Sequence, residues 1–306
     1  MGAGYRLEAY ATLLIGLADL NGQGLRQESG LLDGQCAGRE FNLYRPSGCK
    51  RDTLDSRSGL LYSQTMISWV GTSGFQYPEW RGTFYPEKFS TAKMLPFYAE
   101  RFSTSEINYT FYRIPNSKTI QTWDSSTPEH FRFGLKAPQK ITHIAKLRNC
   151  AELLDVFQRV VSGLGSKLGP VLFQLPPSFK RDTALLSEFL DGVPDGIRVA
   201  LEFRHSSWFE DEIFTHLQNH NAALCIAESS DLATPDIVTA DFGYLRLRRE
   251  DYEKADIVRW AKFIETQDKR WSHAFVYFKH EESGIGPQLA TQLIKELGSA
   301  RTERQK

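Results

Sequence analysis

Strand-like and helix-like segments alternate eight times between Met66 and the last helix-like run of the chain. The strand-like segments are short runs rich in β-branched and aromatic residues, and a helical periodicity follows most of them. They cover residues 67–72, 105–110, 131–136, 169–175, 197–204, 223–228, 243–248 and 274–279. Eight such repeats in succession predict an α/β protein of the (β/α)8 TIM-barrel type. An open, doubly wound sheet is the alternative, but its first turn needs a G-x-G-x-x-G motif that the sequence lacks.

The predicted barrel domain covers residues 66–298, and the flanking residues differ from it in composition. Before Met66, glycines interrupt the sequence often and hydrophobic periodicity is short-lived. We expect residues 1–65 to be an N-terminal extension that is poorly ordered, or a non-native leader translated from upstream of a start at Met66. The alternative is a small helical cap over Arg6–Leu20 that packs on the barrel. Residues 299–306 are expected to be a polar C-terminal tail.

Composition limits the partners that the chain can have. Lys plus Arg and Asp plus Glu number 37 each, so no net charge attracts a polyanion and nucleic acid is not the expected partner. The most apolar early run, Ala9–Leu20, is too short to cross a bilayer, so no membrane association is expected. The four cysteines have no C-x-x-C spacing and predict a reducing, cytoplasmic setting; they are Cys36, Cys49, Cys150 and Cys225.

Polar side chains gather at the ends of the strand-like segments. In a barrel of this type, binding and catalytic groups lie at the carboxyl ends of the strands. We therefore predict one pocket for a small, anionic ligand. The alternative is that Glu106, Glu202, Arg204 and Arg246 form a closed ion-pair network that only fills this end of the barrel. The polar residues at the strand ends are Glu106, Asn108, Lys136, Gln174, Glu202, Arg204, Glu228, Arg246, Arg248 and Lys279.

Two carboxylates are the leading candidates for acid–base work. Glu106 and Glu202 in one barrel end could have their pKa values pushed apart, so that one donates a proton and the other accepts it. His205 is the alternative proton carrier. No cofactor is expected, because the sequence has no H-E-x-x-H or similar ligand spacing. A divalent metal is the secondary alternative, held by Glu106, Glu202, Glu228 and His280.

Further binding residues are predicted in the loops. Aromatic side chains after three strands could hold a sugar or heterocycle beside Ser73, or could instead be lids that pack loops on the barrel. The sequence KHEESGIGPQ places Gly284 and Gly286 before the last helix, where backbone N–H groups could bind a phosphate between Arg246 and Arg248. An ordinary turn before a helix that begins near Pro287 is the alternative. The aromatic residues are Tyr77, Trp80, Tyr112 and Trp208.

Several long motifs occur in the order of a known family. They are VGTSGFQYPEWRGTFYP, INYTFYRIP, a Trp123 with Thr127 and Pro128, FGLKAP, ITH, LGPVLFQLPPSF and ALEFRHSSW. Over roughly Ile67 to Leu297 the chain resembles the YecE-like family, a domain of unknown function. The resemblance implies a TIM-type barrel and no established activity. The sequence departs from the pattern of the family at Arg248–Arg249 and at Lys279–His280, which would change the ligand if these positions touch it.

The leading functional hypothesis is a barrel enzyme that acts on a small polar, phosphorylated or sugar-like metabolite by carboxylate acid–base chemistry, with hydrolysis as one candidate reaction. A second hypothesis is a non-catalytic protein that binds or senses a metabolite in the same pocket. A third is a nuclease-like barrel that acts on nucleic acid. The third hypothesis rests on five cationic residues, namely Arg246, Arg248, Arg249, Lys269 and Arg270.

Overall fold

The structure is a computed structural model that describes residues 66–228, 232–279 and 284–304. The predictions for residues 1–65 and for His280 lie outside these ranges. In the described part of the chain, no helix is both long enough and apolar enough to cross a membrane.

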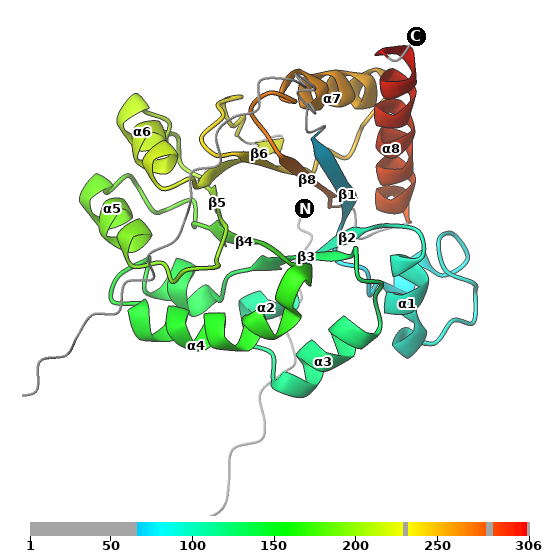
Figure 1. Cartoon of the computed structure of the whole chain (residues 1–306), viewed down its shortest axis with the longest axis horizontal. Helices are drawn as coiled ribbons and strands as arrows, with labels where there is room; N and C mark the ends of the chain where they lie inside the picture. Colours follow the sequence, from blue (N-terminus) through cyan, green and yellow to red (C-terminus); the bar gives the residue numbers. More distant parts are fainter. Residues whose placement is uncertain (1–65, 229–231, 280–283, 305–306) are drawn as a thin grey trace, which may run out of the picture. The chain divides into compact units, whose positions relative to one another are not determined.

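Eight parallel strands close into a barrel in sequence order (Figure 1). The barrel closes because the last strand pairs with the first, with Ile67 opposite His273 and Thr72 opposite Phe278. The predicted (β/α)8 barrel is therefore confirmed. The strands are β1 (Ile67–Ser73), β2 (Thr104–Ile107), β3 (Arg132–Lys136), β4 (Leu168–Gln174), β5 (Val199–Glu202), β6 (Ala223–Glu228), β7 (Phe242–Leu247) and β8 (His273–Phe278).

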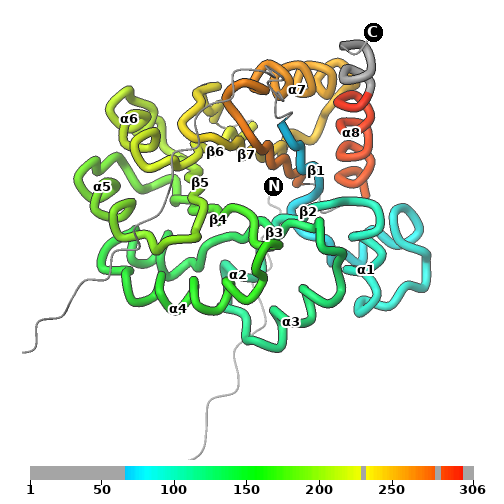
Figure 2. Tube along the Cα trace, viewed as in Figure 1, coloured from blue at the N-terminus to red at the C-terminus, as the bar shows by residue number. Residues whose placement is uncertain are grey.

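Helices surround the barrel on its outer side (Figure 2). Their apolar faces pack on the outward-facing side chains of the strands, as expected for parallel strands buried on both faces. The α-helices are α1 (Met94–Ala99), α2 (Tyr109–Tyr112), α3 (Ser117–Ser125), α4 (Ala151–Val161), α5 (Thr183–Asp191), α6 (Asp211–Asn219), α7 (Lys254–Thr266) and α8 (Ile285–Arg304). Shorter helical turns are η1 (Pro78–Trp80), η2 (Thr91–Lys93), η3 (Lys140–Ile144), η4 (Ser162–Lys167) and η5 (Ser206–Trp208).

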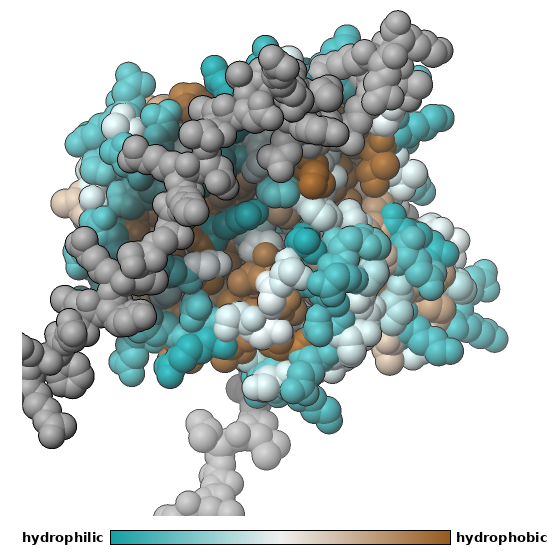
Figure 3. Space-filling view, viewed as in Figure 1, coloured by the Kyte–Doolittle hydropathy of each residue, from teal (hydrophilic) through white to brown (hydrophobic). Residues whose placement is uncertain are grey.

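A second, smaller core fills the barrel interior. Alternate residues along each strand point inward, so large aromatic side chains from β1, β7 and β8 meet small ones from β5 and β6. On the face that Figure 3 shows, hydrophilic side chains gather toward the rim, and hydrophobic ones show mainly toward the middle. The interior core comprises Trp69, Leu172, Ala200, Ala223, Cys225, Ala227, Ala240, Phe242, Tyr244, Phe275 and Tyr277. Cys225 and Cys150 are buried free thiols.

The second strand ends earlier than its sequence indicates. The predicted strand at 105–110 stops at Ile107, and α2 begins two residues later. The Oγ1 of Thr110 lies 3.0 Å from the carbonyl oxygen of Ile107 and 2.6 Å from that of Lys136. These contacts fold α2 over the ends of β2 and β3 and turn the following side chains toward the barrel opening. The fifth strand is likewise shorter than predicted, so Arg204 follows β5 instead of belonging to it.

Candidate functional site

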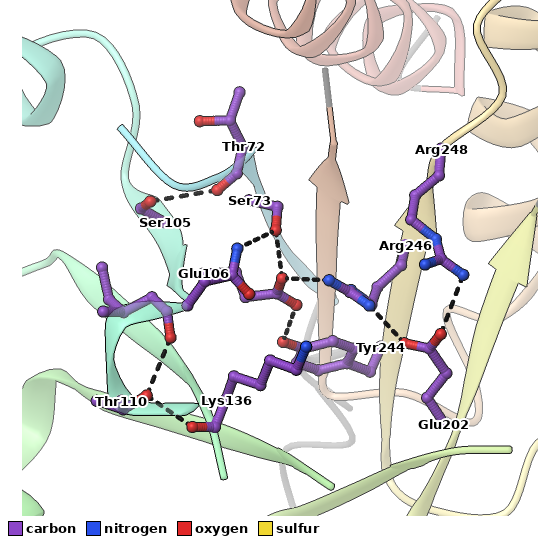
Figure 4. Close-up of polar contacts among 12 residues, drawn as sticks. Thr72, Ser73, Ser105, Glu106, Thr110, Lys136, Glu202, Tyr244, Arg246 and Arg248 are labelled. Carbon is purple, nitrogen blue, oxygen red and sulfur yellow. Dashed lines mark hydrogen bonds and ion pairs between the residues drawn. The ribbon is translucent and has the colours of Figure 1, made fainter. Parts of the chain in front are cut away.

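A buried guanidinium joins two buried carboxylates at the carboxyl end of the barrel (Figure 4). Arg246 Nη2 lies 2.8 Å from Glu106 Oε1, and Arg246 Nη1 lies 2.5 Å from Glu202 Oε2. The three side chains are at most 2% exposed. Burying such charges is costly unless they are paired, and here each charge has its partner. We call this group the Glu106–Arg246–Glu202 network.

Strand register explains why these residues meet. Ser73 lies opposite Glu106 in the β1–β2 pair, and Gln174 lies opposite Glu202 in the β4–β5 pair. All four occupy inward-facing positions near the ends of their strands, one layer beyond the aromatic core. Arg246 also faces inward, because it lies in β7 two residues after the inward-facing Tyr244.

Glu106 accepts hydrogen bonds from three side chains. Ser73 Oγ donates to Oε1, and Tyr244 Oη donates to Oε2 at 2.7 Å, in addition to the contact with Arg246. Burial by itself raises the pKa of Glu106, but the charge of Arg246 and these hydrogen bonds outweigh burial and hold the pKa below its ordinary value. Asn108 completes this side, because its Nδ2 donates to Ser73 Oγ at 3.0 Å.

Glu202 is held mainly by arginines. Arg248 Nη2 donates to Oε1 at 3.0 Å, and Arg204 Nε lies 3.9 Å from the same oxygen. Burial opposes ionisation of Glu202, but the charges of Arg246 and Arg248 lower its pKa from 4.5 to about 2. Both carboxylates are therefore ionised at neutral pH, and neither holds a proton to donate. The acid–base assignment of Glu106 and Glu202 stays a prediction that this geometry does not favour.

A cavity of about 230 Å³ opens directly above the network. We call it the mouth cavity. It brings together nine of the residues predicted to bind substrate, and it adds Phe111, which the sequence reasoning missed. The early end of β2 explains the omission, because α2 carries Phe111 to the opening. The lining residues are Tyr77, Asn108, Phe111, Tyr112, Lys136, Gln174, Arg204, Arg246, Arg248 and Lys279.

The lining of the mouth cavity is strongly cationic. Beyond Arg246, which pairs with both carboxylates of the network, four cationic side chains line the cavity, and the described lining residues include no Asp or Glu. They are Lys136, Arg204, Arg248 and Lys279. Burial, together with the charges of Arg246 and Lys279, lowers the pKa of Lys136 to about 8, although Glu106 and Glu202 act in the opposite direction.

A more apolar pocket of about 290 Å³ adjoins the mouth cavity. The two share Tyr77 and Asn108 in their linings. The Tyr77 ring is fixed there because its Oη donates to the carbonyl oxygen of Ser73 at 2.7 Å. The sequence reasoning did not anticipate this pocket, whose lining is Gly74, Phe75, Gln76, Tyr77, Ile107, Asn108, Tyr109, Thr119 and Trp123.

Two predicted aromatic walls lie elsewhere. Trp80 is fully buried in the loop after β1, where its ring centroid lies 4.7 Å from that of Tyr77. Trp208 stacks on Phe203 at 4.6 Å and donates from Nε1 to the carbonyl oxygen of Phe179 at 2.7 Å. Neither tryptophan is among the residues that line the mouth cavity. Both pack loops on the barrel, which favours the alternative that they are lids over their assignment as ligand-binding residues.

His205 and the two glycines also lie away from the cavity lining. His205 Nδ1 accepts a hydrogen bond from the backbone nitrogen of Ser207 at 3.1 Å and caps η5, so its assignment as a proton carrier stays a prediction that this position does not favour. Gly284 has a φ of 70° and packs so closely on Thr83 that a Cβ would collide with it. Gly286 lies in the first turn of α8. This placement favours the ordinary turn before α8 over a phosphate site beside Arg246.

Glu228 does not join the other predicted metal ligands. It lies on the outer side of β6, where it accepts hydrogen bonds from Tyr252 at 2.6 Å, Trp260 at 2.9 Å and Arg259 at 2.5 Å. The inward-facing positions of β6 are occupied by Ala223, Cys225 and Ala227. Within residues 66–228, 232–279 and 284–304, no three His, Cys, Asp or Glu side chains come together as metal ligands.

The five cations behind the nuclease hypothesis are divided between two ends of the barrel. Arg246, Arg248 and Arg249 lie at or after the carboxyl end of β7, whereas Lys269 and Arg270 precede β8. In a barrel of parallel strands these are opposite ends, so the residues do not form one continuous basic track.

Two curated bacterial proteins share part of this sequence. UPF0759 protein YecE of Escherichia coli (strain K12) is 35% identical over 113 residues, which cover 37% of this chain and 42% of that protein. UPF0759 protein YunF of Bacillus subtilis (strain 168) is 31% identical over 140 residues, which cover 43% of this chain and 50% of that protein. The chain thus matches half or less of the length of these relatives.

Solved structures agree on the fold. A DUF72 family protein from Thermotoga maritima MSB8 has a TM-score of 0.69 and 26% identity, and the match covers 76% of this chain and 99% of that chain. A DUF72 family protein from Enterococcus faecalis V583 has a TM-score of 0.65 and 19% identity, with 76% and 96% covered. The family model described as "Protein of unknown function DUF72" matches residues 69–306. The chain therefore belongs to the DUF72 family, and its resemblance to YecE is confirmed.

Proposed function

We propose that the protein binds a small anionic metabolite in the mouth cavity and acts on it as an enzyme. One observation carries the proposal: among the described residues, the cavity lining holds five cationic side chains and no Asp or Glu. The two carboxylates beneath the cavity are already engaged by arginines. Counted against Glu106 and Glu202, the five cations leave an excess of positive charge, so an incoming anion would meet a positive field in a partly desolvated site.

The arginines favour a phosphate or carboxylate group as the anion. A guanidinium offers paired N–H donors that match the oxygens of either group. Arg204 makes only a 3.9 Å contact with Glu202, and its side chain is 30% exposed, which leaves donors that a ligand can reach. A volume of about 230 Å³ suits a small metabolite better than a polymer. Arg248 and Lys279, which depart from the YecE-like pattern, both line this cavity.

The binding proposal is tested by calorimetry with inorganic phosphate, pyrophosphate and neutral glucose. We expect the two anions to bind and glucose not to bind. Arg248→Met should weaken pyrophosphate binding about tenfold or more, because a charge-assisted contact is lost. Arg148→Met is the matched control, since Arg148 forms an exposed pair with Asp182 and does not line the cavity. Anion binding that is unchanged by Arg248→Met would overturn the proposed site.

A non-catalytic binding protein is the second candidate. The Glu106–Arg246–Glu202 network favours it, because both carboxylates are ionised and fully engaged, which weakens carboxylate acid–base catalysis and hydrolysis by that route. The two candidates separate on turnover. If phosphorylated sugars and small keto acids bind with Arg248-dependent affinity and mass spectrometry detects no product with any of them, binding alone is the better account.

A further inference from the structure

Two lysines line the mouth cavity among the described residues, and of these only Lys136 belongs to a strand. It is the last residue of β3, and its side chain extends across the barrel opening toward the Glu106–Arg246–Glu202 network (Figure 4). Its Nζ lies 4.1 Å from the ring centroid of Phe111. Among the described residues, Nζ has no hydrogen bond and no ion pair within 4 Å, although two carboxylates lie beneath it.

The surroundings of Lys136 favour the neutral amine. Arg246 and Arg248 face the cavity from the end of β7, Lys279 follows β8, and Arg204 follows β5. His143 of η3 lies close enough for Lys136 to influence its pKa. The carboxylates of Glu106 and Glu202 form ion pairs with Arg246 and Arg248 and do not pair with Nζ.

This environment has a measurable consequence for the protonation of Lys136. With a pKa of about 8, roughly a tenth of the side chain is a neutral amine at pH 7. An exposed lysine, with an ordinary pKa near 10.4, has about two hundredfold less neutral amine. A neutral amine fixed on a strand end and open to a ligand cavity is the arrangement that carbonyl chemistry needs.

We propose that Lys136 is a nucleophile that forms an imine with the carbonyl carbon of a small anionic aldehyde or ketone bound in the mouth cavity. The proposal rests on the anion-binding site proposed above. Arg204 and Arg248 would hold the anionic group of the substrate, and Phe111 would cover one side of the amine. The substrate class is therefore a phosphorylated or carboxylated carbonyl compound.

The step balances without an external oxidant or reductant. The lone pair of Nζ forms a bond with the carbonyl carbon, and the carbonyl oxygen takes up a proton to give a carbinolamine. Loss of that oxygen as water, with one further proton taken from solvent and one released from nitrogen, leaves a protonated imine. The protonated imine withdraws electrons from the neighbouring carbon, so that a C–H or C–C bond next to the former carbonyl becomes easier to break.

Reductive trapping tests the proposal. The probe is pyridoxal 5′-phosphate, an anionic aldehyde, and sodium borohydride reduces any imine to a stable secondary amine. Peptide mass spectrometry then locates the label. We expect Lys136 to be labelled before the exposed Lys118 of α3, and Lys136→Met to lose that label. Labelling of Lys136 should rise with pH through about 8, whereas labelling of exposed lysines rises only at higher pH.

Two comparisons separate this proposal from the anion site on which it rests. Pyridoxal lacks the phosphate, so preferential labelling by pyridoxal 5′-phosphate that competing inorganic phosphate suppresses supports both ideas. Equal labelling of Lys136 by the two aldehydes keeps the nucleophile and overturns the anion site. Pyrophosphate binding with Lys136 labelled no faster than Lys118 overturns the nucleophile and keeps the site.

Lys136→Arg retains the positive charge and is the control variant. It should bind pyrophosphate and take no label, and its melting temperature checks that it folds.

Discussion

Arg246 Nη1 lies 2.5 Å from Glu202 Oε2, and neither side chain is more than 2% exposed. The second amino group of the same guanidinium reaches Glu106 from the other side. One arginine of β7 therefore pairs with carboxylates from β2 and β5, strands that are not neighbours in the barrel. The ends of β2, β5 and β7 are therefore held together by the ion pairs of one side chain, Arg246.

Arg246→Met should destabilise the protein by about 3–5 kcal/mol, the cost of leaving buried charges without their partner. Urea denaturation followed by fluorescence measures this difference. Arg148→Met provides the matched control, because Arg148 and Asp182 form an arginine–carboxylate pair at 3.0 Å whose side chains are 52% and 37% exposed. Its loss should cost about 1 kcal/mol or less. Equal stability of the two variants would contradict the role given to Arg246.

Acid should weaken the fold through Glu202. Its pKa falls from 4.5 to about 2 in the folded protein, so the unfolded chain binds the proton more readily. The stabilisation is present above pH 4.5 and is lost as the pH falls toward 2. The urea midpoint should therefore drop across this range, and it should drop less steeply in Glu202→Gln, which has no carboxylate to protonate. A slope that is the same in both proteins would exclude Glu202 as its source.

The strand interior was predictable because it follows a period of two. Tyr244 and Arg246 alternate with outward-facing leucines in β7, and the same parity places Glu106 and Glu202 inside. The same parity also indicates the side on which Glu228 lies. Ala223, Cys225 and Ala227 are the inward-facing residues of β6, so Glu228 had to face outward.

The parts that sequence reasoning missed depend on contacts between distant residues. The sequence does not mark the end of β2 at Ile107 clearly, because Tyr109 and Thr110 are residue types that favour strands, although Asn108 is not. The helical turn is fixed when the Thr110 hydroxyl meets the carbonyl oxygen of Lys136, a contact that depends on how β3 pairs with β2. The burial of Trp80 and Trp208 likewise depends on loop packing that no periodicity encodes.

Tyr244→Phe should destabilise the protein by about 1–3 kcal/mol, because Glu106 Oε2 loses the hydrogen bond that Tyr244 Oη donates at 2.7 Å. Burial of the ring is unchanged, so the loss comes from the hydroxyl group alone. Tyr112→Phe removes a hydroxyl from a side chain that is 73% exposed and should be nearly neutral. Thermal unfolding of the two variants compares them directly, and a Tyr244→Phe protein as stable as the parent would show that water or another donor replaces the hydroxyl.

The interior also depends on a glycine that makes room for an aromatic ring. A Cβ added at Gly134 would lie 2.5 Å from Tyr277 Oη, and that hydroxyl lies 2.9 Å from Thr104 Oγ1. Gly134→Ala should therefore cost about 1–3 kcal/mol, as overpacking of a filled core does. Gly298→Ala is the control, because no described atom outside its own helix lies within 4 Å of its added Cβ and alanine favours the helix.

Tyr277→Phe separates this overlap from a general intolerance of alanine in β3. The variant removes the oxygen that Gly134→Ala would strike, so the alanine should cost less in the Tyr277→Phe background than in the parent. A double-mutant cycle built from urea denaturation measures the difference, and a coupling of about 0.5 kcal/mol or more is expected for residues in contact. Additive effects would mean that the ring moves aside, and that the fit between Gly134 and Tyr277 does not set the packing of this layer.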